Sequence, residues 1–176
     1  SSGVSSGKQS SSRVTYSNVA TPSLILRRND GFAALIRRCQ GLPPVRCAVV
    51  HPCDRDSLFG ALEAARRGLI VPVLVGPEAK IRALAKAEKA DLSGIEIVAT
   101  EHSHAAAEMA VEMARLGQVE ALMKGSLHTD ELMAAIVPST TGLRTARRIS
   151  HVFVMDVPTY PRLLFVTDAA VNIFPT

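Results

Sequence analysis

A regular alternation of short apolar runs with segments of helical periodicity most constrains the fold. Aliphatic runs lie at 46–50, 69–76, 95–99 and 119–123, and apolar residues at helical spacing follow each of them. The run at 69–76 is continuous, which is typical of a strand buried on both faces. Strands that alternate with helices form a parallel sheet through right-handed crossovers, with helices on both faces. The sequence therefore predicts an α/β fold with three αβα layers and a mostly parallel sheet.

The two ends of the chain depart from this alternation. Residues 150–157 and 162–168 are strand-like runs separated by about four turn residues, which predicts a C-terminal β-hairpin rather than another crossover. Residues 1–23 are serine-rich without a period, and we interpret them as a disordered or artificial lead outside the fold. Residues 24–45 are expected to form a linker with a short helix. The main domain is then 46–176.

Polar residues mark the expected starts of three helices. Asp30, Ser103 and either Thr129 or Asp130 stand where helical periodicity begins. A side-chain oxygen at such a position accepts a hydrogen bond from a main-chain N–H of the first turn. We therefore expect these residues to be the N-caps.

Composition narrows the possible functions. The 176 residues are 47% hydrophobic but only 4% aromatic, so the core is aliphatic and few side chains are available to stack on bases. The net charge is +4, but six of the Lys and Arg residues lie in 1–45 against Asp30 alone, so we predict no nucleic-acid partner. No apolar run approaches the roughly 20 residues of a membrane span, and no signal segment begins the chain. We therefore expect no membrane association and a cytoplasmic location.

The cysteines and histidines allow two further chemistries. The three cysteines, Cys39, Cys47 and Cys53, have no CxxC spacing, which favours reduced thiols over a disulfide framework or a zinc knuckle. Cys53 lies near an expected helix N-terminus, where a thiol pKa is lowered, so a nucleophilic role stays open. A zinc site would require three or four of the histidines His102, His104, His128 and His151 to converge, together with a thiolate or carboxylate. We expect His51 and His151 to be structural, hydrogen-bonded histidines.

The segment KGSLHTD at 124–130 is the most informative of the loops that follow the expected strands. In open α/β sheets, ligands bind beyond the carboxyl ends of the strands, where helix N-termini favour anions. Lys124 supplies a point charge, Gly125 lets a phosphate approach the backbone, and the hydroxyls of Ser126 and Thr129 donate hydrogen bonds. The P-loop spacing is missing. An ordinary strand–helix turn with a solvated lysine is the alternative.

A second candidate anion-binding segment is GLRTARRISH at 142–151. It contains three arginines, Arg144, Arg147 and Arg148, whose guanidinium groups can fork onto phosphates. A solvated cationic loop is the alternative. Asp168 ends the last strand-like run, where its carboxylate could be a general base, a metal ligand or a turn former.

Three segments of this sequence resemble the phosphate acetyl/butyryltransferase family. They are HPCDRDSLFGALEAARRGLIVPVLVGP, EHSHAAAEMAVEMARLGQVEALMKGSLHTDELM and GLRTARRISHVFVMDVPTYPRLLFVTDAAVNIFP. The resemblance runs from residue 24 to the end and is most specific in MKGSLHTDEL and GLRTARRISHV. The preceding LRRNDGFAALIRRCQGLPPV resembles the segment that joins a hydratase domain to the transferase in bifunctional enoyl-CoA hydratase members.

The resemblance implies a fold and a reaction. The fold would be similar to that of isocitrate and isopropylmalate dehydrogenases, with two α/β lobes and the active site between them. The reaction would convert acyl-CoA, either acetyl- or butyryl-CoA, and phosphate into acyl phosphate and CoA. Phosphate would attack the thioester directly, so no enzyme nucleophile is needed. Coenzyme A would be a substrate, with no metal or redox cofactor.

The resemblance also implies roles for the candidate residues. The phosphate or acyl phosphate would be held by Lys124, Gly125, Ser126 and Thr129. The CoA phosphates or the attacking phosphate would be bound by Arg144, Arg147 and Arg148. Ser150 would lie near the cleft, and Lys124, Ser126 and Asp168 are the catalytic candidates.

The sequence departs from the family pattern in two respects. It has no DGPL-type motif, the segment that contributes the serine, arginine and aspartate usually given catalytic roles, and Ala146 stands where many relatives have glycine. We therefore expect an incomplete two-lobed fold that exposes apolar surface and associates as a homo-oligomer or aggregates. A non-catalytic CoA- or phosphate-binding module is one alternative function. A metal-dependent decarboxylating dehydrogenase of the same fold is another, although only Asp168 suggests its carboxylates.

Overall fold

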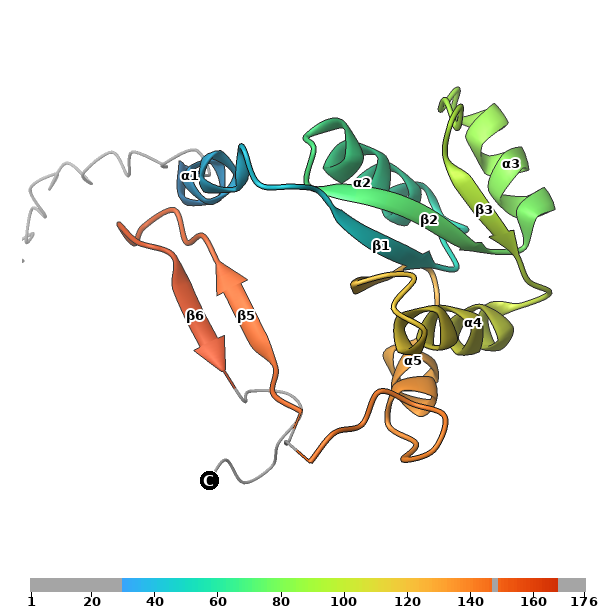
Figure 1. The fold of residues 1–176 in the computed structure, drawn as a ribbon. Coiled ribbons are helices and arrows are strands. Elements are labelled where there is room, and N and C mark those ends of the chain that lie inside the picture. Colours follow the sequence, from blue (N-terminus) through green and yellow to red (C-terminus); the bar gives the residue numbers. More distant parts are fainter. Residues whose placement is uncertain (1–29, 147–148, 168–176) are drawn as a thin grey trace, which may run out of the picture.

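The computed structural model describes residues 30–146 and 149–167, and Figure 1 shows their arrangement. The helices are α1 (Asp30–Cys39), α2 (Arg55–Arg66), α3 (Glu78–Ala87), α4 (Ser103–Arg115) and α5 (Thr129–Ile136). The strands are β1 (Val45–Val50), β2 (Ile70–Gly76), β3 (Glu96–Ala99), β4 (Ala121–Lys124), β5 (Val152–Met155) and β6 (Leu164–Thr167).

The first four strands form one parallel sheet in the order β3-β2-β1-β4. Val49 pairs with Leu74 of β2 and with Met123 of β4, so β1 lies in the middle of the sheet. Each of these strands leads into a helix, and the parallel α/β sheet predicted from the alternation is confirmed.

Helices cover both faces of this sheet. On one face, Leu58 of α2 and Ile81 of α3 pack with Val49 and Leu74. On the other face, small residues of α4, including Ala106, pack with the alternate residues of β1 and β2. Successive strand residues point to opposite faces, so one pair of strands serves both clusters. The predicted three layers are confirmed, with an aliphatic core.

The C-terminal hairpin of β5 and β6 is also confirmed, as an antiparallel pair. The prediction of about four turn residues is wrong, because the connection spans residues 156–163. Two prolines in this connection cannot donate to the ladder, which ends the pairing early. Within the connection, Asp156 accepts hydrogen bonds from the main-chain N–H groups of Gly31 and Phe32 at 3.0 and 3.2 Å. The hairpin therefore lies beside α1, apart from the four-stranded sheet (Figure 1).

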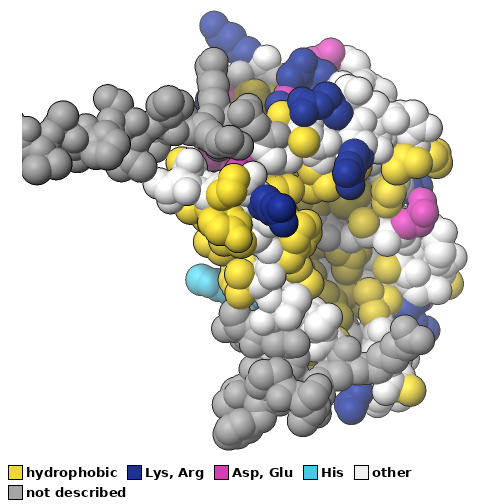
Figure 2. Space-filling view, turned by 90° about the vertical axis from the view of Figure 1, so that its left-hand side faces the viewer, with side chains coloured by type: hydrophobic (Ala, Val, Ile, Leu, Met, Phe, Trp, Pro, Cys, Tyr) yellow, Lys and Arg dark blue, Asp and Glu magenta, His cyan; other side chains and the backbone are white. Residues whose placement is uncertain are grey.

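The hairpin leaves apolar side chains exposed on both strands. Phe165 is 62% exposed, and all four residues of β5 are exposed as well. Figure 2 looks onto this side of the molecule and shows hydrophobic side chains gathered there, with Lys and Arg among them. A two-stranded ribbon with both faces in water is only marginally stable by itself. This surface agrees with the expected exposure of apolar residues in this chain.

Candidate functional site

The candidate site lies at the carboxyl ends of β1 and β4, where the strand order reverses: β2 and β3 lie on one side of β1, and β4 lies on the other. These strands are neighbours, and Val50 pairs with Lys124 at their last residues. The helix that follows β1 packs on one face, whereas the helix that follows β4 packs on the other. The loops therefore diverge above this point, which is the crevice where open α/β sheets bind ligands.

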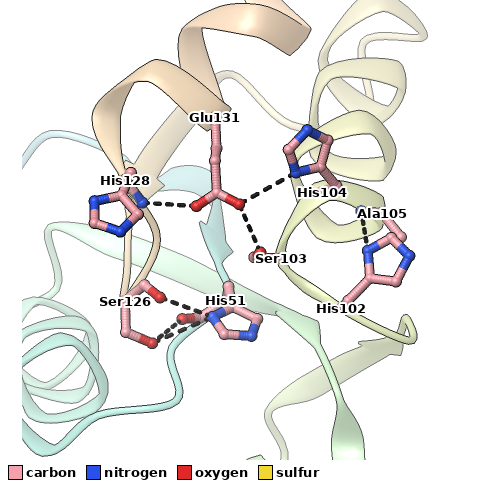
Figure 3. Close-up of polar contacts among 8 residues, drawn as sticks. All are labelled: His51, His102, Ser103, His104, Ala105, Ser126, His128 and Glu131. Carbon is pink, nitrogen blue, oxygen red and sulfur yellow. Dashed lines mark hydrogen bonds and ion pairs between the residues drawn. The ribbon is translucent and has the colours of Figure 1, made fainter.

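Ser126 joins the two loops through its hydroxyl group (Figure 3). Its Oγ donates to the carbonyl of His51 at 2.9 Å and accepts from the main-chain N–H of Cys53 at 3.1 Å. The Nδ1 of His51 lies 3.0 Å from the carbonyl oxygen of Ser126, and because that oxygen only accepts, the ring nitrogen donates. The expected hydrogen bonding is confirmed for His51, whereas the Nδ1 of His151 is buried without a hydrogen-bond partner among the described residues. The Ser126 hydroxyl thus braces the start of one loop against the other.

Gly125 fits against the end of β1 with no room for a side chain. Its N–H donates to the carbonyl of Val50 at 2.9 Å. A Cβ at this position would lie 2.6 Å from the carbonyl oxygen of His51 and would also clash with that of Val50. His51 itself has a left-handed backbone with φ of 55°, which is uncommon for a residue other than glycine. The glycine is therefore required by contact between two main chains.

Lys124 and Asp54 place opposite charges beside this contact. Lys124 is the last residue of β4, and its side chain is exposed. Asp54 is the N-cap of α2 and accepts the N–H of Ser57 at 2.7 Å. That hydrogen bond is the main cause of the lowered pKa of Asp54, and the charge of Lys124 lowers it further. The lysine thus offers a positive charge beside an acid that stays ionised.

Glu131 forms a second polar centre, between α4 and α5. Its Oε2 accepts the main-chain N–H of His128 at 2.8 Å, and its Oε1 accepts the hydroxyl of Ser103 at 2.9 Å. The Nδ1 of His104 lies 3.1 Å from the same Oε1. The hydrogen bonds from His128 and Ser103 are the leading causes that lower the pKa of Glu131 to about 2. The carboxylate therefore holds the two helix N-termini together (Figure 3).

Histidines replace the expected caps of these two helices. The N-cap of α4 is His102, whose Nδ1 accepts the N–H of Ala105 at 3.1 Å, and the N-cap of α5 is His128. The predictions of Ser103 and of Thr129 or Asp130 as caps are wrong. Ser103 instead donates its hydroxyl to Glu131. The predicted cap Asp30 is likewise the first residue of α1.

The structure brings together only part of the predicted site. Lys124, Gly125, Ser126 and Thr129 lie between the carboxyl end of β4 and the start of α5. Arg144 is exposed and follows Leu143, whose N–H binds the carbonyl of Ile136 at the opposite end of α5. Ser150 is exposed just before β5. Arg147, Arg148 and Asp168 lie outside the described residues.

The sequence analysis missed Glu131 and its partner Ser103. Glu131 lies three residues after the N-cap His128, which is the spacing of a capping box. The motif was not recognised because its N-cap is usually Ser or Thr, and here it is histidine.

Two of the alternative chemistries are not supported within 30–146 and 149–167. The expected lowering of the Cys53 pKa is wrong, because burial raises it, and the nearby Asp54 adds to this while Lys80 opposes it. No group of three or more His, Cys, Asp and Glu side chains in these ranges is arranged to hold a metal ion. None of the helices in the same ranges has the length and apolar character that crossing a membrane requires.

A separate groove of about 640 Å³ runs along α4 and α5. Its lining includes Met109 and Ala135, together with the acids Glu101, Glu108 and Glu112 and the base Arg115. Arg115 is paired with Glu112, so the groove keeps an excess of negative charge and is a poor candidate for phosphate.

Comparison with known proteins provides the family context. The family model described as phosphate acetyl/butaryl transferase matches residues 99–176. A phosphate acetyltransferase of Rhizobium meliloti is 60% identical over 144 residues, which cover 82% of this chain and 46% of that protein. A phosphate butyryltransferase of Clostridium beijerinckii is 35% identical over 147 residues, with coverage of 84% and 49%. The chain therefore spans about half the length of these curated relatives.

Solved structures share the fold. A phosphotransacetylase from Streptococcus pyogenes aligns with a TM-score of 0.68 at 14% identity, over 85% of this chain and 54% of that one. EutD phosphotransacetylase from Staphylococcus aureus aligns with a TM-score of 0.57 at 14% identity, over 80% of this chain and 51% of that one.

Proposed function

This chain belongs to the phosphate acetyl/butyryltransferase family, and we propose that the protein containing it converts acetyl-CoA and phosphate into acetyl phosphate and CoA. The identity of 60% to a phosphate acetyltransferase carries this proposal. The lower identity of 35% to a phosphate butyryltransferase makes acetyl-CoA the favoured substrate over butyryl-CoA.

In the proposed reaction an oxygen of phosphate attacks the thioester carbon. The new C–O bond forms as the C–S bond breaks, and the electron pair leaves on the CoA sulfur, which takes up the phosphate proton. Phosphate is itself the nucleophile, so the step involves no change of oxidation state, and CoA is a substrate rather than a cofactor. The protein's task is to hold an anion and aim it at the carbonyl.

The loop from Lys124 to Thr129 is the proposed place for the phosphate. Lys124 supplies the positive charge, and the first-turn N–H groups of α5 lack acceptors within the helix. Gly125 and Ser126 set the path of the loop against the end of β1. We propose a catalytic role for Lys124 and a positioning role for Ser126, because the Ser126 hydroxyl is bound to His51 and Cys53.

The later arginine segment is proposed to bind CoA. Arg144, Arg147 and Arg148 would contact its phosphates, and Ser150 and Asp168 would lie near the cleft between lobes.

We also propose that the exposed β5–β6 surface is buried in a homo-oligomer. Light scattering tests that assembly, and a monodisperse monomer of the full reading frame would contradict it.

The decisive assay is phosphate-dependent release of CoA from acetyl-CoA and butyryl-CoA. It is run on this chain and on the product of its full reading frame. A Lys124→Ala variant should lower kcat/KM for phosphate roughly 10- to 100-fold, the range for losing a hydrogen bond to a charged group. Lys86→Ala removes an exposed lysine of α3 and is the matched control. CoA binding without release from either protein would instead favour the non-catalytic module.

A further inference from the structure

We propose that Glu131 is a positioning residue that fixes the Lys124–Thr129 loop for anion binding, a role that rests on the proposed function. Glu131 lies in the first turn of α5, and its side chain is only 20% exposed. One carboxylate oxygen holds the N–H of His128 in the loop, and the other holds Ser103 and His104 of α4. The side chain thus links the loop to a different helix of the same layer.

The loop is fixed at two points. At its start, Ser126 is bound to His51 and Cys53 of the neighbouring loop. At its end, the N–H of His128 is bound to Glu131 at 2.8 Å. Hydrogen bonds to an ionised acceptor are about twice as strong as neutral ones, so the second point is held firmly. Releasing it frees the segment that leads into α5.

Two other roles for Glu131 would give different results. If Glu131 acted only through its charge, its removal would strengthen phosphate binding, because a negative charge beside a phosphate site is unfavourable. If it only stabilised the fold, its removal would reduce the amount of folded protein and leave the kinetic constants of the folded fraction unchanged. A positioning role instead predicts weaker phosphate use by folded protein, because a displacement of about 1 Å costs on the order of 100-fold in rate.

The test compares Glu131→Ala, Glu131→Gln and Glu108→Gln in the product of the full reading frame. Glu108 is an exposed acid of α4 outside the phosphate loop, and its side chain makes no hydrogen bond or ion pair within the described residues. We expect Glu131→Ala to raise KM for phosphate or lower kcat roughly 10- to 100-fold per folded molecule. Glu131→Gln keeps a side-chain oxygen and should restore part of the loss, and Glu108→Gln should stay close to the parent. A lower KM in Glu131→Ala, or unchanged constants, would overturn the proposal.

Amide hydrogen exchange tests the positioning without any assay of turnover. The N–H groups of Gly125 and Ser126 donate to the carbonyl groups of Val50 and His51. Neither amide is bound to Glu131, so a change in their exchange reports on the loop as a whole. We expect their exchange to accelerate at least roughly 10-fold in Glu131→Ala and to stay unchanged in Glu108→Gln. If the parent protein releases no CoA, the proposed function fails while this measurement still decides the positioning. Equal protection in all variants would refute it.

Discussion

Replacing Gly125 with alanine should destabilise the protein and disrupt the loop after β4. The added Cβ would lie 2.6 Å from the carbonyl oxygen of His51 and 2.8 Å from its carbonyl carbon. An ordinary carbon–oxygen contact is about 3.3 Å or longer, so relieving the contact with His51 needs a main-chain movement of roughly 0.7 Å, and the closer contact with the Val50 carbonyl oxygen needs more. His51 cannot yield easily, because its N–H is bound to the carbonyl of Val75 in β2 at 2.7 Å.

The expected destabilisation is about 3 kcal/mol. Overpacked core positions usually lose about 1–3 kcal/mol, and the upper end applies here because both colliding groups are backbone. With a urea dependence of about 2 kcal/mol per M, the midpoint of unfolding should fall by roughly 1.5 M.

A glycine in the middle of α2 provides the control. A Cβ at Gly60 would meet no atom within 4 Å, and Gly60→Ala should raise stability by about 0.5–1 kcal/mol. Urea unfolding followed by circular dichroism measures both variants. A Gly125→Ala midpoint within roughly 0.3 M of the parent would refute the steric argument.

Three further predictions concern single side chains. The pKa of Glu131 lies at about 2, below the ordinary value of 4.5. The ionised side chain therefore stabilises the fold at pH values above 4.5, and this stabilisation is lost as the pH falls toward 2. The stability difference between the parent and Glu131→Gln should therefore shrink on acidification, and a constant difference in urea midpoint would contradict this. Asp54→Ala removes the N-cap of α2 and should lower the free energy of unfolding by about 1 kcal/mol, measured by urea unfolding. The Oγ1 of Thr100 is buried without a hydrogen-bond partner in the described part of the chain, so Thr100→Val should be neutral or stabilising by up to about 1 kcal/mol in thermal unfolding, and a clear loss would mean that the hydroxyl is satisfied.

The layers of the fold followed from the sequence because apolar periodicity records burial directly. The run at 69–76 became β2, whose residues from Pro72 to Gly76 are buried. The order of the strands could not be predicted from this periodicity, because parallel strands joined by crossovers can be arranged in several orders. The contact between His51 and Ser126 joins residues 75 positions apart, and it forms because β1 and β4 are adjacent in the order β3-β2-β1-β4.

The candidate site was predicted by residue type but not by role. KGSLHTD does occupy the carboxyl end of β4. The glycine was expected to admit a ligand, whereas its nearest neighbours are the carbonyl groups of Val50 and His51. The cap of α4 was misplaced because the imidazole nitrogen of His102 accepts a hydrogen bond as a hydroxyl or carboxylate oxygen does, whereas N-cap preferences favour Ser, Thr, Asp and Asn.

The hydrogen bonds from α1 to Asp156 also set an order of events in folding. They join residues 124 and 125 positions apart, whereas β1 and β2 pair Val45 with Ile70. Closing a loop about five times longer costs about 1.4 kcal/mol more in entropy, so distant contacts form after local ones. We therefore expect the pairing of β1 and β2 to form first and the docking of α1 on the hairpin to complete the fold. In reverse, the amides of Gly31 and Phe32 open to solvent while Val49 is still protected.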